Sequence, residues 1–489
     1  MPSEAQDAMV LAVAVSDLAV HEMLDDPAYR PLADAIAREV AGQPPAGFLV
    51  SRITELTAAI EAGDRIRGRE NLDLLAAYER LTRLGRPLNA VASVAGVPRR
   101  SADGPLAGRP VAVKDIIAVD GLPTRCGSPA TSDRPATADA ALVSRLRAAG
   151  AEVFATAQCL EFAAGFAHPS VGDTRNPRNQ ERTSGGSSGG SAALVAAGVC
   201  DLAIGTDTGG SIRIPAAYCG VVGLKPTYGL VPTDGVFPLS PSLDHAGTLT
   251  ATAAGSAALM QAIAGPLPAP PATGVPVVGV LSAQLADPSV TPEVRVSLRA
   301  ALEGLAAAGW QLREVRPPWL EDPQRWEEAL TIIVASEAVA CHAGRDTSQY
   351  AEGTRALLEL GAGITPEQYA RARAAQAELT AAVEQTLAGV DALAGPTVGY
   401  CAPEQDPPFG VDGDNAEGRF TGPYNLTGHP AVSIPVPAPG LPVGLQLAGR
   451  RHGDLALLEV AAAAQRVLAT SLLERAPAVD GDDLAGHPA

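Results

Sequence analysis

Lysine is nearly absent from this chain of 489 residues. Of its 36 basic residues only Lys114 and Lys225 are lysines, and both lie in apolar, glycine-rich surroundings. Arginine stays protonated under ordinary conditions, whereas a buried lysine can lose its proton and act as a base. We therefore infer that a neutral amine is needed at one of the two positions. The alternative for each is a packing or hydrogen-bonding requirement for a slim ammonium group.

Positive charge is also in short supply. The formal net charge is −18, which argues against general affinity for nucleic acid or for anionic membranes. The N-terminus carries Glu4 and Asp7 where a signal peptide would carry positive charge, and no apolar run reaches about 18 residues. Hydrophobic residues make up 46% of the chain, which is typical of a large globular interior. We expect a cytoplasmic protein with no membrane and no nucleic-acid partner.

The cysteines form no recognisable group. There are six, and none belongs to a CxxC pair or has the short spacing of a metal site (126, 159, 200, 219, 341 and 401). The pattern favours reduced, mostly buried thiols over a disulfide framework. We expect neither a metal nor another cofactor.

Strand-like and helix-like segments alternate over most of the chain and indicate one large α/β/α layered domain. We expect a helical N-terminal extension over 1–47, this domain over 48–475 and a loose tail over 476–489. Inside the domain we expect a catalytic core at about 85–260, a proline-rich connector at 265–276 and a substrate-side and closing segment at 277–470. Buried strands are predicted at 108–121, 151–155, 219–227, 277–281, 311–315, 392–395, 431–436 and 443–448, with a mostly helical stretch over 321–388.

Two serines lie in glycine-rich loops 24 residues apart. Ser187 is in Thr-Ser-Gly-Gly-Ser-Ser-Gly-Gly-Ser (183–191), and Ser211 is in Gly-Thr-Asp-Thr-Gly-Gly-Ser-Ile-Arg (205–213). Glycine lets the main chain approach a ligand closely, so such loops can present N–H groups to an anion. A developing oxyanion needs donors of this kind, and a hydroxyl beside them is a candidate nucleophile. Hydrolysis of a carbonyl compound is therefore the first hypothesis.

Two other interpretations of these loops fit less well. A phosphate-binding loop needs G-x-x-x-x-G-K-[ST], or G-x-G-x-x-G between a strand and a helix, and neither is present. The G-x-S-x-G pattern of an α/β-hydrolase-like esterase occurs twice, centred on Ser187 and Ser188. That nucleophile elbow follows a buried apolar strand, whereas the residues before it here are polar (175–183). Capping of the following helix is the expected role of Ser184, Ser188 and Ser191.

Several long motifs together resemble the amidase signature family. They lie between about residues 51 and 470, and they are Pro-Val-Ala-Val-Lys-Asp (110–115), the two serine loops, Cys-Gly-Val-Val-Gly-Leu-Lys-Pro (219–226), Leu-Thr-Gly-His-Pro-Ala (426–431) and Leu-Pro-Val-Gly-Leu-Gln (441–446). The resemblance implies a mixed, mostly parallel twisted central sheet. It also implies Ser211 as nucleophile, Ser187 as the bridging serine after a cis peptide bond, Lys114 as base and Lys225 as a structural residue.

The resemblance implies further roles around this triad. The backbone N–H groups of Thr208, Gly209 and Gly210 are expected to form the oxyanion hole. Asp207 and Arg213 are expected to brace the loop electrostatically. The remaining candidates are two further supporting residues, Gly186 and Ser188, and five aromatic residues that could line a substrate pocket, Phe162, Phe166, Tyr218, Phe420 and Tyr424.

The expected activity is hydrolysis of the C–N bond of a small amide, aryl amide or carbamate (urethane) through an acyl-enzyme on Ser211, with esterase activity also possible for the same site. We expect a monomer or a homodimer. The family also includes an amidotransferase-type subunit that works with partner subunits on charged tRNA. The acidity of the chain and its N-terminal extension favour the stand-alone hydrolase, and the amidotransferase role is kept as the alternative.

Overall fold

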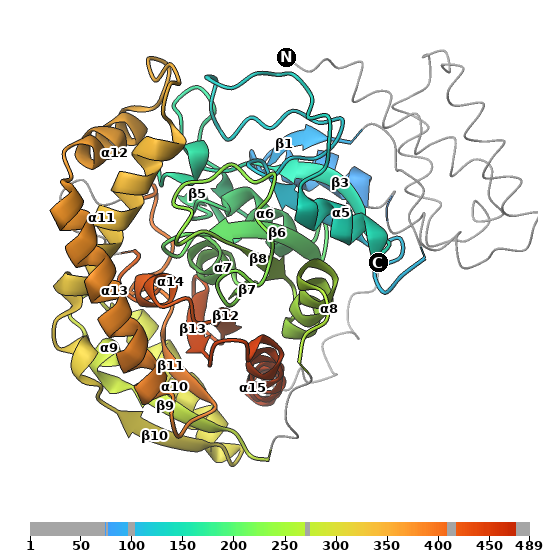
Figure 1. Cartoon of the computed structure of the whole chain (residues 1–489). Helices are drawn as coiled ribbons and strands as arrows, with labels where there is room; N and C mark the ends of the chain where they lie inside the picture. The colour runs from blue at the N-terminus through green and yellow to red at the C-terminus, as the bar shows by residue number, and fades with distance from the viewer. Residues whose placement is uncertain (1–73, 75–76, 96–102, 269–273, 408–416, 476–489) are drawn as a thin grey trace, which may run out of the picture.

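The computed structural model describes residues 74, 77–95, 103–268, 274–407 and 417–475 (Figure 1). The expected N-terminal extension (1–47) and tail (476–489) lie outside these residues, as does part of the expected connector. No helix in the described part of the chain combines the length and the apolar character that crossing a bilayer would require.

One large sheet runs through the molecule. Its strand order is β1-β3-β2-β6-β8-β7-β12-β13-β11-β9-β10, and β4 and β5 form a separate pair. The strands are β1 (Val91–Val94), β2 (Pro110–Lys114), β3 (Glu152–Ala157), β4 (Arg175–Asn176), β5 (Asn179–Thr183), β6 (Leu202–Asp207), β7 (Val222–Lys225), β8 (His245–Thr250), β9 (Val277–Leu281), β10 (Gln311–Val315), β11 (Ala392–Pro396), β12 (Ala431–Val436) and β13 (Val443–Ala448).

The sheet is mixed, as predicted, but the expectation that it is mostly parallel is wrong. Parallel pairing joins β2 to β3 and β6, and joins β9 to β10 and β11. All other neighbours in the sheet pair antiparallel. The strand-helix-strand rhythm holds at the two ends of the sheet, whereas β12 and β13 in the middle are joined by a short turn that can only give antiparallel strands.

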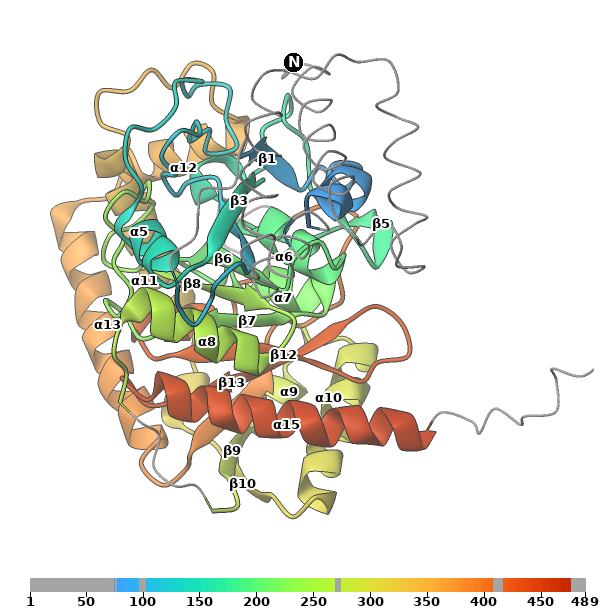
Figure 2. The ribbon, with the colours of Figure 1, turned by 90° about the vertical axis from the view of Figure 1, so that its right-hand side faces the viewer.

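Helices cover both faces of the sheet. They are α5 (Ala141–Ala148), α6 (Gly189–Ala196), α7 (Arg213–Cys219), α8 (Ala253–Ala264), α9 (Ser282–Ala286), α10 (Pro292–Ala307), α11 (Pro323–Cys341), α12 (Glu352–Ala362), α13 (Pro366–Thr386), α14 (Gly422–Leu426) and α15 (Asp454–Arg475), with short turns η2 (Leu81–Gly85), η3 (Glu161–Ala163) and η4 (Pro318–Leu320). Figure 2 shows α8 and α15 side by side over one face of the sheet. In Figure 1, α11, α12 and α13 stand together along the left-hand edge.

The two faces of the central strands belong to different cores. Val111 and Val113 of β2 pack in the same core as the residues of α5 and α8, whereas Ala112 between them packs with α6. Strands buried on both faces have continuous apolar sequences, which is why β2 was recognisable. Because β2 and β6 run parallel and in contact, Lys114 at the end of β2 lies beside the end of β6 and the loop that follows it. This edge of the sheet positions the site.

Candidate active site

The Lys114 side chain is fully buried at the end of β2 and touches two hydroxyl groups. Its Nζ donates hydrogen bonds of 2.7 Å to Ser187 Oγ and of 2.7 Å to Thr206 Oγ1. Neither Lys114 nor Ser187 exposes any surface. Burial lowers the pKa of Lys114 to about 8, because the charged amine loses its hydration and gains no carboxylate contact in return. A large fraction of this amine is therefore neutral at mildly alkaline pH.

The Ser187 loop is packed so tightly that glycine is required before the serine. The peptide bond between Gly186 and Ser187 is cis, as the resemblance implies. A Cβ atom on Gly186 would lie 2.1 Å from Leu160 Cδ1, which is far inside van der Waals contact. Leu160 N also donates a hydrogen bond of 3.3 Å to Ser187 O. The loop is thus held against the segment after β3.

Two neighbouring serines attach this loop to β6. Ser188 Oγ donates to Thr206 O (3.0 Å) and accepts from Thr206 N (3.1 Å), and Ser191 Oγ donates to Ile204 O (2.9 Å). The expectation that Ser184, Ser188 and Ser191 cap α6 is wrong: Ser188 occupies the N-cap position, but its side chain makes no capping bond, Ser191 lies inside the helix, and the Ser184 hydroxyl donates to Gly185 O. The backbone groups at the end of β6 compete for the Ser188 hydroxyl instead. These bonds bring the two serine loops together.

Ser211 lies in the loop between β6 and α7 and is half-buried. Its carbonyl oxygen accepts a hydrogen bond of 3.1 Å from Ser188 N, so the main chains of the two serine loops are in contact. Ser211 and Gly186 line the same pocket. Within the described residues the Ser211 hydroxyl has no hydrogen-bond partner, which leaves it accessible from the pocket.

The backbone N–H groups of residues 208–211 have no acceptor among the described residues. Thr208, Gly209 and Ser211 line the pocket as well, which places this loop at its wall. Gly210 has φ of 144°, and a Cβ atom there would lie 2.4 Å from Thr421 Oγ1. Only glycine fits both this conformation and this contact. Unpaired N–H groups in a loop that lines the same pocket as a serine are what an oxyanion hole requires.

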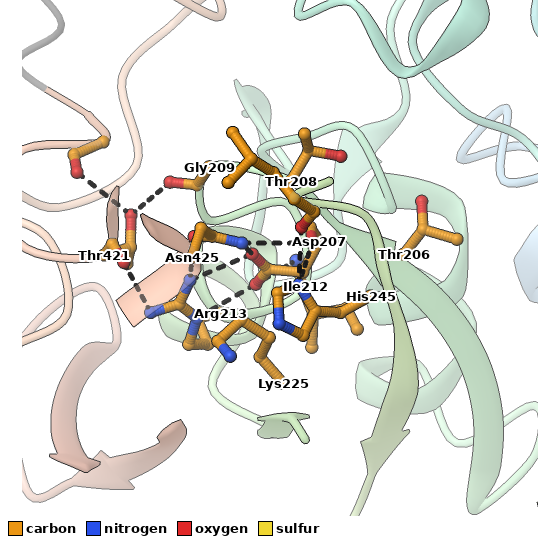
Figure 3. A network of polar contacts seen from close by, with 12 residues as sticks. Thr206, Asp207, Thr208, Gly209, Ile212, Arg213, Lys225, His245, Thr421 and Asn425 are labelled. Carbon is orange, nitrogen blue, oxygen red and sulfur yellow. Dashed lines mark hydrogen bonds and ion pairs between the residues drawn. The ribbon is translucent and has the colours of Figure 1, made fainter. Parts of the chain in front are cut away.

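A buried ion pair holds the loop from behind (Figure 3). Arg213 Nε and Nη2 donate to the two carboxylate oxygens of Asp207, each at 2.9 Å. Burial opposes the charged form of Asp207, but Arg213 and Asn425 more than offset it, so its pKa is held below the usual range. Asp207 Oδ2 also accepts from Ile212 N at 3.2 Å. The pair therefore joins the start and the end of the 208–211 loop.

The closing segment of the chain completes this network (Figure 3). Arg213 also donates to Asn425 Oδ1 (2.7 Å) and to Thr421 O (2.9 Å). A further bond of 2.7 Å goes from Arg213 to Gln446 Oε1. Thr421 Oγ1 in turn donates to Gly209 O at 2.6 Å. All donors of Arg213 are directed at protein atoms, and its side chain is fully buried, so it does not reach the pocket.

The pocket beside Ser211 encloses about 570 Å³, counting the space at its open mouth. We call it the Ser211 pocket, and its wall consists of Leu160, Ala163, Ala164, Gly165, Gly186, Thr208, Gly209, Ser211, Ile214, Leu239, Val334, Pro407, Glu417 and Gly418. Most of these come from segments distant in sequence, such as Val334 from α11. Only Gly186, Thr208, Gly209 and Ser211 of this wall were candidates from the motifs, and no local pattern marks the others.

None of the five aromatic residues expected to line a pocket belongs to this wall. Phe162 packs in a buried cluster with Phe237, His342 and Tyr350. Phe166 lies against Gly353 of α12. Tyr218 is buried behind the pocket with its hydroxyl on Glu417. Phe420 and Tyr424 are buried in the main core. Apolar aromatic rings next to motif residues are used here for packing, and small aliphatic groups form the pocket.

The second lysine, Lys225, is also fully buried, at the end of β7. Its Nζ donates to the carbonyl oxygens of His429 (2.7 Å) and Pro226 (3.0 Å). It therefore ties β7 to the segment before β12 and contacts neither serine. In the described part of the chain, His, Cys, Asp and Glu side chains form no group of three that could hold a metal ion.

Comparisons with known proteins agree with the motifs. A family model described as Amidase matches residues 87–458. The A subunit of the glutamyl-tRNA(Gln) amidotransferase of Halobacterium salinarum is 36% identical over 416 residues, which cover 75% of this chain and 97% of that protein.

Solved structures show the same fold. A structure described as an amidase is 34% identical, with a TM-score of 0.72 over 80% of this chain and 94% of the other. The structure of 6-aminohexanoate cyclic dimer hydrolase complexed with substrate is 28% identical, with a TM-score of 0.70 over 80% of this chain and 92% of the other. The family expected from the motifs is confirmed, and the chain belongs to the amidase signature family.

Proposed function

We propose that this protein hydrolyses the C–N bond of a small amide, aryl amide or carbamate through an acyl-enzyme on Ser211. The observation that carries the proposal is the contact between Lys114 Nζ and Ser187 Oγ, 2.7 Å long and excluded from water, in a loop whose next residue, Ser188, donates its N–H to Ser211 O. An amine of lowered pKa joined to a hydroxyl is an arrangement that can activate a serine nucleophile.

The proposed acylation moves one proton along two hydroxyl groups. Neutral Lys114 accepts the proton of Ser187 while Ser187 accepts the proton of Ser211, and Ser211 Oγ attacks the carbonyl carbon. The negative charge that develops on the carbonyl oxygen is stabilised by the N–H groups of residues 208–211, each donor contributing on the order of 3 kcal/mol. Ser187 then returns a proton to the leaving nitrogen, and the C–N bond breaks.

Deacylation repeats the same path with water. A water molecule takes the place of the amine, Ser187 accepts its proton, and the hydroxide attacks the acyl carbon. The ester bond to Ser211 breaks, and Ser211 Oγ regains its proton from Ser187. For a carbamate the released acid is a carbonate monoester, which loses CO₂ in solution.

The Ser211 pocket supports a small, largely apolar acyl group. Apart from Glu417 and the hydroxyls of Thr208 and Ser211, the side chains in its described wall are aliphatic or absent. The 6-aminohexanoate cyclic dimer hydrolase, to which this chain is similar over 92% of that enzyme, is by its name also a hydrolase. These points favour a stand-alone amidase.

The second candidate function is that of an amidotransferase subunit, and the curated relatives favour it over the first. The relative from Halobacterium salinarum is matched over 97% of its length, and its name describes action on glutamyl-tRNA. Such a subunit would use the same serines and lysine but would depend on partner subunits. The net charge of −18 opposes direct binding of tRNA by this chain alone.

One experiment separates the two. The purified chain is incubated by itself with a panel of simple amides, anilides and carbamates, and acyl-enzyme formation on Ser211 is followed by mass spectrometry. Turnover by the isolated chain supports the stand-alone amidase. Turnover that appears only with added partner subunits, or a stable complex with them in cell extract, would establish the amidotransferase role instead. Absence of acylation in both settings would refute the proposed chemistry.

A further inference from the structure

The Ser211 pocket contains a single ionisable side chain in its described wall, Glu417. The other side chains of this wall are aliphatic apart from the hydroxyls of Thr208 and Ser211. Tyr218 Oη donates a hydrogen bond of 2.7 Å to Glu417 Oε1. A carboxyl group in such a wall is costly unless its oxygens and its proton find partners, so its presence calls for an explanation.

Tyr218 is connected to both loops that hold the serines of the candidate triad. It lies on α7, in the helix that follows Ser211, and its side chain is fully buried. A Cβ atom on Gly185 would lie 2.6 Å from the Tyr218 ring, so the ring packs directly on the loop that carries Ser187. The Tyr218 ring also lies near the ring of Tyr400, with ring centroids 6.3 Å apart. The hydroxyl that orients Glu417 is thus fixed relative to both serines.

The surroundings of Glu417 favour the uncharged acid. The titratable groups that act on it are Tyr218 and Asp406, with Tyr400 beyond Tyr218, and no arginine or lysine is among the groups that act on it in the described part of the chain. Burial, together with the neighbouring Asp406, raises the pKa of Glu417 to about 8. A neutral carboxyl group has one O–H donor. Because Oε1 accepts from Tyr218, the proton belongs on Oε2.

We propose that Glu417 is a specificity residue that donates a hydrogen bond from its neutral carboxyl group to an acceptor oxygen on the substrate group that occupies the Ser211 pocket. The substrate class is then an amide or carbamate whose pocket-bound group is mainly hydrocarbon but contains one ether or carbonyl oxygen. This inference rests on the proposed hydrolysis. A purely hydrocarbon group would bury the Glu417 O–H without a partner, and sites of that kind discriminate against analogues that lack the polar atom.

The test uses a series of acyl anilides of equal length. One member is all-carbon, and in each of the others a single CH₂ is replaced by oxygen at a successive position along the acyl chain. For the wild-type protein we expect one ether to exceed the all-carbon parent in kcat/KM by about tenfold or more. Glu417→Leu should abolish or reverse that preference, and Glu417→Gln should keep the preference, because the amide also donates a hydrogen bond. Tyr218→Phe retains Glu417 but leaves its carboxyl group free to rotate, so the preference for the ether should weaken.

A pH series distinguishes hydrogen bonding by Glu417 from a purely structural role. A structural role would leave the preference for the ether unchanged with pH. The ratio of kcat/KM for the preferred ether to that for the all-carbon parent cancels the titration of Lys114, since both substrates use the same catalytic groups. That ratio should fall as pH rises through about 8 in the wild type, where Glu417 loses its proton, and stay constant in Glu417→Gln. A ratio that is equal in wild type and Glu417→Leu, or that never exceeds one, would overturn the proposal.

Failure of the proposed function can be distinguished from failure of the proposed role of Glu417. If the wild type hydrolyses no member of the series, hydrolysis of these aryl amides is refuted, and the same ratio is then taken from calorimetric dissociation constants of the intact anilides. Equal affinities for ethers and parent would overturn the role of Glu417 as well. Circular dichroism shows whether each variant folds, and if Glu417→Leu does not, the Glu417→Gln pH series and Tyr218→Phe decide the question.

Discussion

The Thr421 hydroxyl donates a hydrogen bond of 2.6 Å to the carbonyl oxygen of Gly209, a residue 212 positions earlier in the chain. The contact orients the Gly209 peptide. Since a peptide's N–H and C=O groups point in opposite directions, a fixed carbonyl at Gly209 also fixes the direction of the next N–H, that of Gly210. The closing segment therefore helps to set the geometry of the proposed oxyanion hole.

Thr421→Val should slow catalysis more than it weakens substrate binding. The substitution preserves shape but removes one hydrogen bond worth about 0.5–1.5 kcal/mol, so kcat should fall about two- to tenfold with KM little changed. Steady-state kinetics on an anilide would show this. Thr380→Val is the matched control, because the Thr380 hydroxyl bonds only within α13, to Gln376 O. An equal loss in both variants would contradict the assignment.

Ser211→Ala should abolish turnover while the protein remains folded. The variant lacks the oxygen that forms the acyl-enzyme, so kcat should fall by at least about 10³-fold, and labelling by a serine-directed phosphonate or sulfonyl fluoride should disappear. Mass spectrometry of the intact protein reports the label, and circular dichroism reports the fold. Hydrolysis at the wild-type rate would remove Ser211 from its proposed role.

Lys114→Arg should be nearly inactive although it keeps a positive charge. Arginine does not give up its proton in proteins, so it cannot accept the proton of Ser187. Single-turnover acylation should be lost, and melting should show that enough folded protein remains to measure it. Lys225→Arg serves as the contrast: its amine bonds only to backbone carbonyls, so the substitution should lower the melting temperature rather than block acylation selectively. Acylation by Lys114→Arg at the wild-type rate would place the base elsewhere.

Activity should rise with pH through about 8. Burial lowers the pKa of Lys114 to about 8, and acylation needs the neutral amine, which predominates above that pH. Below it, kcat/KM should decrease by about tenfold per pH unit, as expected for one required deprotonated group. The measurement is a pH profile of acylation on a substrate without ionisable groups. A profile flat from pH 6 to 9 would rule out Lys114 as the titrating base.

Asp207→Ala should strongly destabilise the protein. It leaves the Arg213 guanidinium buried without its carboxylate, and breaking a buried pair in this way costs about 3–5 kcal/mol. Urea unfolding followed by circular dichroism measures the change. Asp133→Ala is the control, because its pair with Arg125 is at the surface, with 84% of the Asp133 side chain exposed, and should change stability by less than about 1 kcal/mol. A small effect at both positions would mean that the network is not needed for folding.

Elements with a strong local pattern could be predicted from the sequence. The strands at 277–281, 311–315, 431–436 and 443–448 have the predicted bounds, since each is a short apolar or alternating run between turn residues. In contrast, β6 and β8 were not predicted. Both are fully buried but contain small and polar residues, such as Gly205 in β6 and His245 in β8, whose place in the sheet depends on partners far away in the chain.

The candidate site divides in the same way. Lys114, Ser187 and Ser211 could be picked out because glycine-rich motifs and the scarcity of lysine mark them. The wall of the Ser211 pocket could not, because Leu160, Val334 and Glu417 come from three separate segments that only the folded chain brings together. Ser188 shows a further limit: its position before α6 indicates a cap, yet its hydroxyl bonds to Thr206 on β6.

Both lysine side chains of this protein are enclosed in its interior, one at each of two strand ends. The folded molecule therefore presents no ε-amino group to the reagents that chemists use to attach dyes, cross-linkers or resins to enzymes. Modification of Lys114 by such a reagent would require the fold around β2 to open first. The extent of labelling at Lys114 therefore measures how often the region around the proposed reaction centre opens to solvent.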